Sequence, residues 1–412
     1  MAAVIKKFLI VCANYPPELI GVGKYVGEMA ADLVARGFEV RVITAPPHYP
    51  DWQVAPDYQA SRYRREYSDQ IVIFRCPLYV PRRPTGALRI LHLLTFALSS
   101  LPVTLWQALV WRPQVVMVIE PPLVCAPAAY LAARLVGAKA WLHVQDFEVD
   151  AAYELGLLRR GFWQAGMLWF ERSLMRGFDR VSTISQPMMI ALADKQVRAS
   201  KRMLFPNWVD AQALVPGSRL RQLRGEWGVD EATVLVLYAG NLGKKQGVEV
   251  LIGAARRLLE RPSIRFLIVG EGTERAALVD CAQGLTNLMF LPLQPAEQLV
   301  ELLQCADIHA LPQRAAAEGL VMPSKLLAMM ASGRPVVATA RAGSAVATLV
   351  RLGGVVTAPG DEEALAAAIG ALADAPDVRA TLGAAGRDFA VRHFDRRVVL
   401  DAAFSPKSLA TL

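Results

Sequence analysis

Residues 8–44 read FLIVCANYPPELIGVGKYVGEMAADLVARGFEVRVIT and set a pattern that the rest of the chain follows. An apolar run of strand length at Phe8–Ala13 comes first, residues of helical period follow at Gly23–Ala35, and a second apolar run lies at Val40–Thr44. This order predicts a βαβ unit of a parallel sheet. The pair Arg36-Gly37 provides the basic last turn and the glycine that commonly end such a helix.

Strand-length apolar runs recur along the chain, with a stretch of helical period between most of them. They lie at residues 71–74, 115–119, 140–144, 181–184, 234–238, 264–269, 289–291, 308–311, 336–339 and 354–356. An alanine-rich helix is expected at Glu363–Leu372. The alternation predicts an α/β fold of two doubly wound, Rossmann-like domains.

The domain boundaries follow from chain length and from turn-forming residues. A chain of 412 residues suits two domains of roughly 100 to 200 residues each. Proline, glycine and arginine accumulate after residue 205, as is usual for a linker. We predict an N-terminal domain at 1–205, a linker at 206–231, a second domain at 232–385, and a C-terminal helical segment at 386–412 with the option of packing back on the first domain.

Positive charge is concentrated in one part of the first domain. The chain has a net charge of +8, and only Glu66 and Asp69 oppose the arginines of one short stretch. These arginines are Arg62, Arg64, Arg65, Arg75, Arg82, Arg83 and Arg89. A basic surface there favours an anionic membrane surface or a phosphorylated substrate. Nucleic acid is not an expected partner, because the sequence lacks the zinc spacings, aromatic motifs and basic tails that usually accompany it.

The cysteines and the N-terminal region indicate the compartment. Five cysteines are scattered along the chain without a Cys-x-x-Cys spacing, which argues against a disulfide framework or a zinc site. The apolar run at Phe8–Ala13 is too short for a signal peptide. We therefore expect a cytoplasmic protein.

Residues 90–111 form an uncharged stretch long enough to span a bilayer. Pro102, together with nearby polar residues, is expected to split it into two shorter helices. Three interpretations remain open: a hairpin in the protein core, helices lying in the membrane interface, and a transmembrane span, which the broken pattern favours least.

Two segments of the first domain carry candidate functional residues. Gly21 and Gly23 lie in a turn that opens a helix, where backbone N–H groups can face a phosphate or hydroxyl, although tight turning alone would also explain them. The spacing is not that of a dinucleotide site. Asp146 follows the run at 140–144 and is a candidate to contact the acceptor or accept a proton. His143 is expected to be a buried strand residue.

The second domain carries three further turns. Gly240, Asn241, Lys244 and Lys245 lie between a strand and a helix, where glycines and lysines can hold a pyrophosphate. The other turns contain Gly270, Gly272, Arg314, Glu318, Gly319, Ser324 and Lys325. Ser324 is expected to cap a helix, and Lys325 would lie in its first turn, where a cation is unfavourable unless an anion is near. Solvent-exposed lysines are the alternative. The sequence shows no acid pair or metal cluster, so no metal or cofactor is required.

Together these segments resemble the retaining GT-B glycosyltransferases of the glycosyl transferase group 1 type, and especially the fucosyltransferases of colanic-acid-like exopolysaccharide assembly. The resemblance is carried by residues 15–23, 143–146, 206–210, 240–247 and 311–336. It implies two Rossmann-like domains facing a cleft, a nucleotide-sugar held by the second domain, a lipid-linked or glycan acceptor held by the first, and retention at the anomeric carbon. GDP-fucose is the donor that the narrower group suggests.

Several family positions carry other residues in this chain. Gln145-Asp146 occupies the place of the family's His-Asp, so Asp146 is predicted as a catalytic residue. Asn241 and Gln246 replace an arginine and the phosphate-binding lysine, so Lys244 or Lys245 would have to take over that role, and Lys245 is predicted as the second catalytic residue. Ala328 replaces a ribose-binding glutamate. We expect a cytoplasmic glycosyltransferase, peripheral on the inner face of the cell membrane. A sugar-nucleotide epimerase, an NAD-dependent oxidoreductase and a non-catalytic binding protein are the alternatives.

Overall fold

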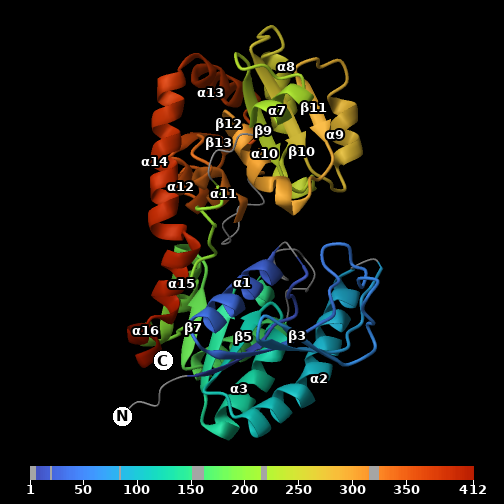
Figure 1. The fold of residues 1–412 in the computed structure, drawn as a ribbon, viewed down its shortest axis with the longest axis vertical. Coiled ribbons are helices and arrows are strands. Elements are labelled where there is room, and N and C mark those ends of the chain that lie inside the picture. Colours follow the sequence, from blue (N-terminus) through green and yellow to red (C-terminus); the bar gives the residue numbers. More distant parts are fainter. Residues whose placement is uncertain (1–5, 19–20, 83–84, 151–161, 215–219, 315–323) are drawn as a thin grey trace. The chain divides into compact units, whose positions relative to one another are not determined.

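The βαβ order expected at the N terminus is present as β1 (Lys7–Val11), α1 (Val22–Ala35) and β2 (Glu39–Thr44). The structure is a computed structural model, and it describes residues 6–18, 21–82, 85–150, 162–214, 220–314 and 324–412. The chain divides into two compact units (Figure 1), of which the first comprises residues 1–206 with 400–412 and the second comprises residues 207–399.

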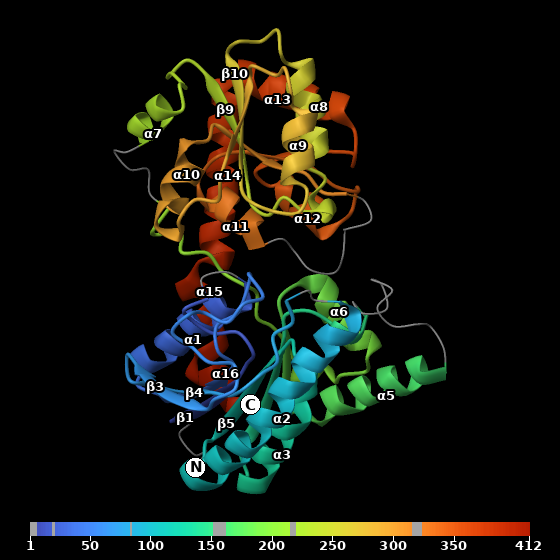
Figure 2. The same ribbon diagram turned by 90° about the vertical axis from the view of Figure 1, so that its right-hand side faces the viewer.

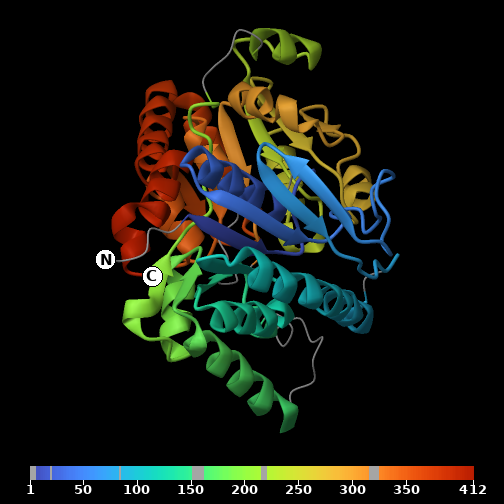
Figure 3. The ribbon, with the colours of Figure 1, turned by 60° about the horizontal axis from the view of Figure 1, so that its bottom comes forward.

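The first unit is built on an eight-stranded sheet in the order β3-β4-β2-β1-β5-β6-β7-β8, in which β3 alone pairs antiparallel. Helices α2, α3 and α5 form one layer over one face of this sheet (Figures 2 and 3). The remaining elements are β3 (Arg64–Ser68), β4 (Ile71–Arg75), α2 (Gly86–Trp111), β5 (Val115–Glu120), α3 (Ala126–Val136), β6 (Lys139–Val144), α5 (Phe162–Gly177), β7 (Arg180–Thr183), α6 (Gln186–Asp194), β8 (Arg202–Leu204), α15 (Arg396–Phe404) and α16 (Pro406–Ala410).

The second unit is built on a six-stranded sheet in the order β11-β10-β9-β12-β13-β14, with parallel pairing throughout. Its elements are α7 (Leu220–Glu226), β9 (Val234–Ala239), η3 (Lys244–Gln246), α8 (Glu249–Arg257), β10 (Ile264–Val269), α9 (Arg275–Cys281), β11 (Leu288–Leu291), α10 (Leu299–Cys305), β12 (Ile308–Leu311), α11 (Ser324–Ala331), β13 (Val336–Thr339), α12 (Ala345–Val350), β14 (Gly354–Thr357), α13 (Glu362–Asp374) and α14 (Pro376–Phe394). The two sheets confirm the α/β, doubly wound fold class.

The expected break in the stretch at 90–111 does not occur, and the prediction of two shorter helices was wrong. One continuous helix, α2, contains Pro102. Proline removes the hydrogen bond to the carbonyl four residues before it, here Leu98. Both Pro102 and Leu98 lie on the exposed side of α2, where a freed carbonyl can bond to solvent.

Two boundary segments pack more closely than linkers do. The segment 206–231, predicted as a linker, contains α7, and its Leu223 and Trp227 pack against the core of the second unit. At the C terminus, the ring of Phe404 packs against Phe8 and Trp141, with centroids 5.9 and 5.6 Å apart. Residues 400–412 therefore belong to the first unit.

Candidate active site

Two glycine turns lie side by side at the carboxyl ends of β9 and β10. The backbone N–H of Leu242 donates to the Glu271 carbonyl at 2.9 Å, and Gly240 donates to the end of β10 at the same distance. A Cβ atom at Gly270 would overlap the Gly240 carbonyl oxygen, and one at Gly272 would overlap the Leu242 carbonyl. The contact between the turns thus explains Gly270 and Gly272 without a ligand, and their donor-binding role stays a prediction.

Lys325, in the first turn of α11, reaches the first of these turns. Its Nζ donates to the Tyr238 hydroxyl at 3.2 Å and lies 4.3 Å from the centroid of the Tyr238 ring. The hydroxyl in turn donates to the Asn241 carbonyl at 2.7 Å. A Cβ atom at Gly240 would lie 3.3 Å from Nζ. These contacts hold the ammonium next to the turn, where the loss of water on burial lowers the pKa of Lys325 to about 8.

Arg314 lies on the other side of the same turn. Its guanidinium donates to Glu249, at the start of α8, at 2.8 Å, and a Cβ atom at Gly247 would lie 3.1 Å from the Arg314 Cγ. Gly247 has φ +65°, a left-handed conformation that favours glycine. Arg314 is therefore near the turn, but a carboxylate already faces its charge.

The structure thus brings Gly240, Asn241, Arg314 and Lys325 together around one strand-to-helix turn. Lys244 is exposed in η3 of the same turn. Helix α11 begins at Ser324, close to the predicted start. The side chains of Lys245 and Ser324 lie outside the described part of the structure, as do Glu318 and Gly319 entirely, so the roles predicted for these four residues stay predictions.

In the first unit, the buried Glu18 side chain lies beyond the carboxyl ends of β1 and β2. Glu18 accepts hydrogen bonds from the backbone N–H groups of His48 at 2.8 Å and Tyr49 at 3.0 Å, and from Asn14 Nδ2 at 2.8 Å. It joins the segment after β1 to the segment after β2. No local sequence pattern indicates this role, because His48 and Tyr49 lie about thirty residues from Glu18.

Gly21 and Gly23 lie at the start of α1, beside this carboxylate. Gly21 is the N-cap residue with φ +67°, which favours glycine. A Cβ atom at Gly23 would lie 3.2 Å from the Glu18 carboxylate. An external phosphate would therefore share this helix N terminus with the Glu18 carboxyl group. The backbone conformation accounts for Gly21, and close packing accounts for Gly23.

An aromatic and histidine cluster, also missed from sequence, lies next to Glu18. The rings of His48 and His92 are 4.8 Å apart, and Trp52 lies 5.3 Å from His92. Trp52 has φ +52°, an uncommon backbone conformation for a bulky residue. The Arg89 guanidinium lies 5.6 Å from the Trp52 ring centroid. Burial lowers the pKa of His92 to about 4, so this histidine is neutral near pH 7. We refer to these four residues as the Trp52 cluster.

Asp146 lies just beyond the carboxyl end of β6, as predicted from its place after the run at 140–144. Its neighbour Gln145 donates to His143 Nε2 at 2.9 Å, and His143 Nδ1 lies 2.9 Å from the Ser182 hydroxyl. His143 is buried in β6, as predicted, and burial lowers its pKa to about 3. Both ring nitrogens are therefore used within the fold, which leaves Asp146 as the titratable candidate in this segment.

A second layer of acids supports the segment after Asp146. Glu148 accepts the Leu123 N–H at 2.7 Å, and the Glu148 N–H lies 3.4 Å from the fully buried Glu120. Burial, followed by repulsion from nearby carboxylates including Glu171, raises the pKa of Glu120 well above its ordinary value. Burial also raises the pKa of Glu148. Burial thus disfavours the ionised form of both carboxyl groups, and the contacts that they make lie within the fold.

Lys195, directly after the last residue of α6, contacts acids of this layer. Its Nζ lies 2.8 Å from Asp150 and 2.5 Å from Glu171, and 4.9 Å from the Phe147 ring. These contacts fix both flanks of the segment that contains Asp146. Within the described residues, the acids and histidines form no group of three or more that could hold a metal ion.

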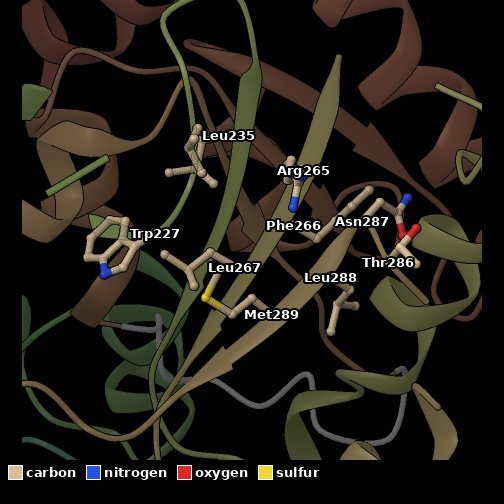
Figure 4. Close-up of a pocket in the computed structure, with 10 residues that line it drawn as sticks. Trp227, Leu235, Arg265, Phe266, Leu267, Thr286, Asn287, Leu288 and Met289 are labelled. Carbon is tan, nitrogen blue, oxygen red and sulfur yellow. The ribbon is translucent and has the colours of Figure 1, made fainter. Parts of the chain in front are cut away.

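A small cavity of about 190 Å³ lies elsewhere in the second unit (Figure 4). Trp227, Leu267 and Met289 are among its lining residues. It contains none of the predicted site residues and lies against the middle and amino-terminal parts of β10 and β11, whereas ligands of open α/β sheets bind beyond the carboxyl ends. We attribute no function to it.

Two family models match the chain. Residues 21–208 match the model described as a glycosyl transferase 4-like domain, and residues 233–375 match the one described as glycosyl transferases group 1. Among similar proteins, the glycosyl transferase WcaI of Escherichia coli (strain K12), whose name provisionally assigns it to colanic acid biosynthesis, is 44% identical over 345 residues. That match covers 82% of this chain and 84% of WcaI.

More distant similarities agree on the architecture. A D-inositol 3-phosphate glycosyltransferase of Saccharomonospora viridis is 33% identical over 46% of each chain. Sucrose-phosphate synthase from Thermosynechococcus elongatus superposes with a TM-score of 0.74 at 17% identity, covering 99% of this chain and 100% of that one. Anabaena HepE, in complex with UDP and glucose, gives 0.70 at 17% identity over 99% and 100% of the two chains. At these identities the solved structures show the GT-B fold alone.

Proposed function

The chain belongs to the glycosyl transferases of group 1, and from this premise we propose that it moves a sugar from a nucleotide-sugar donor to a lipid-linked or exopolysaccharide precursor, with retention at the anomeric carbon. The family membership supports transfer of a glycosyl group. The choice of donor, acceptor and stereochemistry is our proposal.

The observation that carries the proposal is the position of Lys325 on Tyr238 at the Gly240 turn. When the bond between the anomeric carbon and the phosphate oxygen breaks, its electron pair adds charge to the leaving diphosphate. A partly desolvated cation and backbone N–H groups next to that charge stabilise the transition state more than water does. Lys325 would supply the cation, with Lys244 and Lys245 as further candidates.

The acceptor would bind at the first unit. Its hydroxyl forms the new bond to the anomeric carbon from the face that the diphosphate leaves, and its proton goes to Asp146 or to the departing phosphate oxygen. The Trp52 cluster adds an aromatic ring and the cation of Arg89, which suit a sugar and a phosphate respectively. No metal or other cofactor has a part in this proposal.

The donor base and sugar are proposed from resemblance and from relatives. The name of WcaI refers to colanic acid biosynthesis, and the sequence resembles fucosyltransferases of that kind, so we propose GDP-fucose. HepE was solved with UDP and glucose, which makes UDP-glucose the comparison. We place the protein in the cytoplasm, peripheral on the inner face of the cell membrane.

Thermal unfolding of the purified protein with GDP, UDP, ADP and their sugars tests the donor. A ligand at 100 times its Kd stabilises the folded state by about 2.7 kcal/mol, which raises Tm. We expect a selective response to GDP and GDP-fucose, followed by transfer of labelled fucose to a lipid-linked glycan. A rise in Tm with UDP and UDP-sugars alone would show that the donor is a UDP-sugar and not GDP-fucose. No rise in Tm with any nucleotide would favour a non-catalytic protein. Conversion of the donor without an acceptor would favour the epimerase.

A further inference from the structure

Helix α2 exposes large apolar side chains and buries several polar ones beside its buried apolar residues, unlike an ordinary surface helix. The described residues contain one helix long and apolar enough to cross a membrane, and it is α2, yet only 28% of its most apolar window is buried. Large apolar side chains follow one exposed stripe along its whole length. They are Leu91, Leu94, Leu98, Trp106 and Leu109, and their exposed fractions run from 42% to 70%.

The face of α2 that turns toward the protein is partly polar, and its polar groups have partners. His92 Nδ1 lies 2.6 Å from the Tyr79 carbonyl, and Gln107 Oε1 accepts from Arg41 at 2.6 Å. Thr104 donates to a carbonyl of its own helix at 2.8 Å. A surface helix normally buries its apolar stripe and exposes its polar face. Because the polar face here is bonded within the fold, the exposed apolar stripe is not the result of a rotated helix.

Neighbouring helices extend this stripe into a surface. Helices α3 and α5 lie in the same layer as α2, over one face of the sheet (Figures 2 and 3). On α3, Leu131 and Leu135 are 48% and 55% exposed, and on α5, Trp169 and Phe170 are 66% and 49% exposed. An exposed apolar surface of this extent marks an interaction site rather than ordinary surface variation.

The charges on this layer have one sign. The exposed charged residues on the described parts of α2, α3 and α5 are all arginines: Arg89, Arg134, Arg172 and Arg176. The single acid on these helices, Glu171, is buried against Lys195, while Arg134 also pairs with Asp179 beyond the end of α5. Apolar side chains flanked by cations complement an anionic lipid surface, in which tryptophan favours the interface and arginine the headgroups.

We propose that the exposed face of α2, α3 and α5 docks on an anionic lipid bilayer, with its leucine and tryptophan side chains in the interfacial region. A second copy of this chain is a poorer occupant, because a symmetric contact would bring arginines against arginines. A transmembrane α2 would expose the bonded polar face to hydrocarbon. Resting on the proposed function, the docking gives the Trp52 cluster access to a lipid-linked acceptor, since His92 and Arg89 lie on the first turns of α2.

Flotation of the full chain with vesicles tests the proposal. We compare pure phosphatidylcholine with a mixture containing phosphatidylglycerol, and expect binding only to the mixture. The double variant Leu98→Glu/Leu109→Glu should weaken binding on the order of a hundredfold, because it removes two apolar contacts and adds two negative charges. Val378→Glu, at a 49% exposed position on α14 of the second unit, is the matched control and should bind as the wild type does.

The charges are tested separately by Arg172→Glu/Arg176→Glu, which should weaken binding to the phosphatidylglycerol vesicles on the order of tenfold or more. Undiminished flotation of the leucine variant would overturn the proposal, as would light scattering that shows a dimer broken by the same substitutions. The circular dichroism spectrum and the thermal unfolding curve of each variant, compared with those of the wild type, show that the first unit is folded. The nucleotide-induced Tm shift separates this result from the proposed function, because loss of vesicle binding with an intact Tm shift leaves donor binding unchanged.

Discussion

The ammonium of Lys325 lies over the ring of Tyr238, 4.3 Å from its centroid and 3.2 Å from the phenolic oxygen. Tyr238 is nearly the last residue of β9 and is fully buried, so its ring position is fixed by the core. The cation is consequently held at the Gly240 turn before any ligand binds. Such preorganisation is what electrostatic stabilisation of a leaving group requires.

Lys325→Met should lower kcat for sugar transfer on the order of 100-fold to 1,000-fold, because the positive charge that faces the leaving diphosphate is lost. Methionine keeps most of the side-chain length and removes a desolvated cation, so the free energy of unfolding should change by less than about 1 kcal/mol. Single-turnover transfer of labelled sugar and urea unfolding measure the two effects.

Tyr238→Phe and Lys139→Met provide the comparison for Lys325. In Tyr238→Phe the cation stays in place but loses its hydrogen bond to the phenolic hydroxyl. We expect kcat to fall by about tenfold or less, which corresponds to at most about 1.4 kcal/mol. Lys139 is exposed at the amino end of β6, away from the carboxyl ends of the strands, and its variant should behave as the wild type does. Normal turnover in Lys325→Met would refute the role of this lysine.

Most strands were predictable because each is an uninterrupted apolar run between turn residues. Two strands were not. β3 has the sequence RREYS and is largely exposed, and only its antiparallel pairing with β4 makes it a strand. β8 has three residues, too few to show a period. An edge strand that pairs on one side needs no buried face, so the local pattern carries little signal.

The candidate site residues that local patterns could predict lie at strand ends or at helix starts. Gly240 and Lys325 were found from local patterns, Gly240 from strand-turn-helix order and Lys325 from an unfavourable charge at a helix start. Glu18 and Trp52 were not found, because their roles arise from contacts between segments that follow different strands. Gly270 shows why a glycine pattern is a weak signal for a ligand: a close backbone approach already requires glycine at this position, and its donor-binding role stays a prediction.

Gly270→Ala should therefore destabilise the second unit whether or not a donor is present. The added Cβ would overlap the Gly240 carbonyl oxygen, and backbone cannot move away as a flexible side chain can. We expect a loss of more than about 3 kcal/mol in urea unfolding. Gly284→Ala is the control, since Gly284 has φ +82° but open space around its Cβ position, and strain alone should amount to about 1 kcal/mol. Equal losses at the two sites would disprove the packing explanation.

Glu120→Gln should change how stability depends on pH. Burial raises the pKa of Glu120 well above its ordinary value. Between the unfolded-state pKa of about 4.3 and the higher folded-state pKa, the native protein binds more protons than the unfolded chain, so stability falls as pH rises. Glutamine removes this contribution. Urea unfolding between pH 5 and pH 8 should give a flatter profile for the variant than for the wild type.

The control for this pH effect is Glu363→Gln, since the Glu363 side chain is 82% exposed. It should leave the slope of stability against pH unchanged. A Glu120→Gln profile parallel to the wild type would show that Glu120 is ionised in the folded protein, against the direction of the pKa shift.

Replacement of Glu18 should separate acceptor binding from donor binding. Glu18→Ala leaves the N–H groups of His48 and Tyr49 without their acceptor, which should destabilise the protein by about 2 to 4 kcal/mol and loosen the segment that carries Trp52. Because the donor is proposed to bind at the second unit, KM for the acceptor should rise while the nucleotide-induced Tm shift persists. Glu18→Gln keeps an oxygen for both N–H groups, and its amide can donate to a flipped Asn14, so it should restore most of the stability and the acceptor KM. If Glu18→Gln fails as badly as Glu18→Ala does, the negative charge rather than the hydrogen-bond geometry is what Glu18 contributes; if neither changes the acceptor KM, the Trp52 cluster does not bind the acceptor.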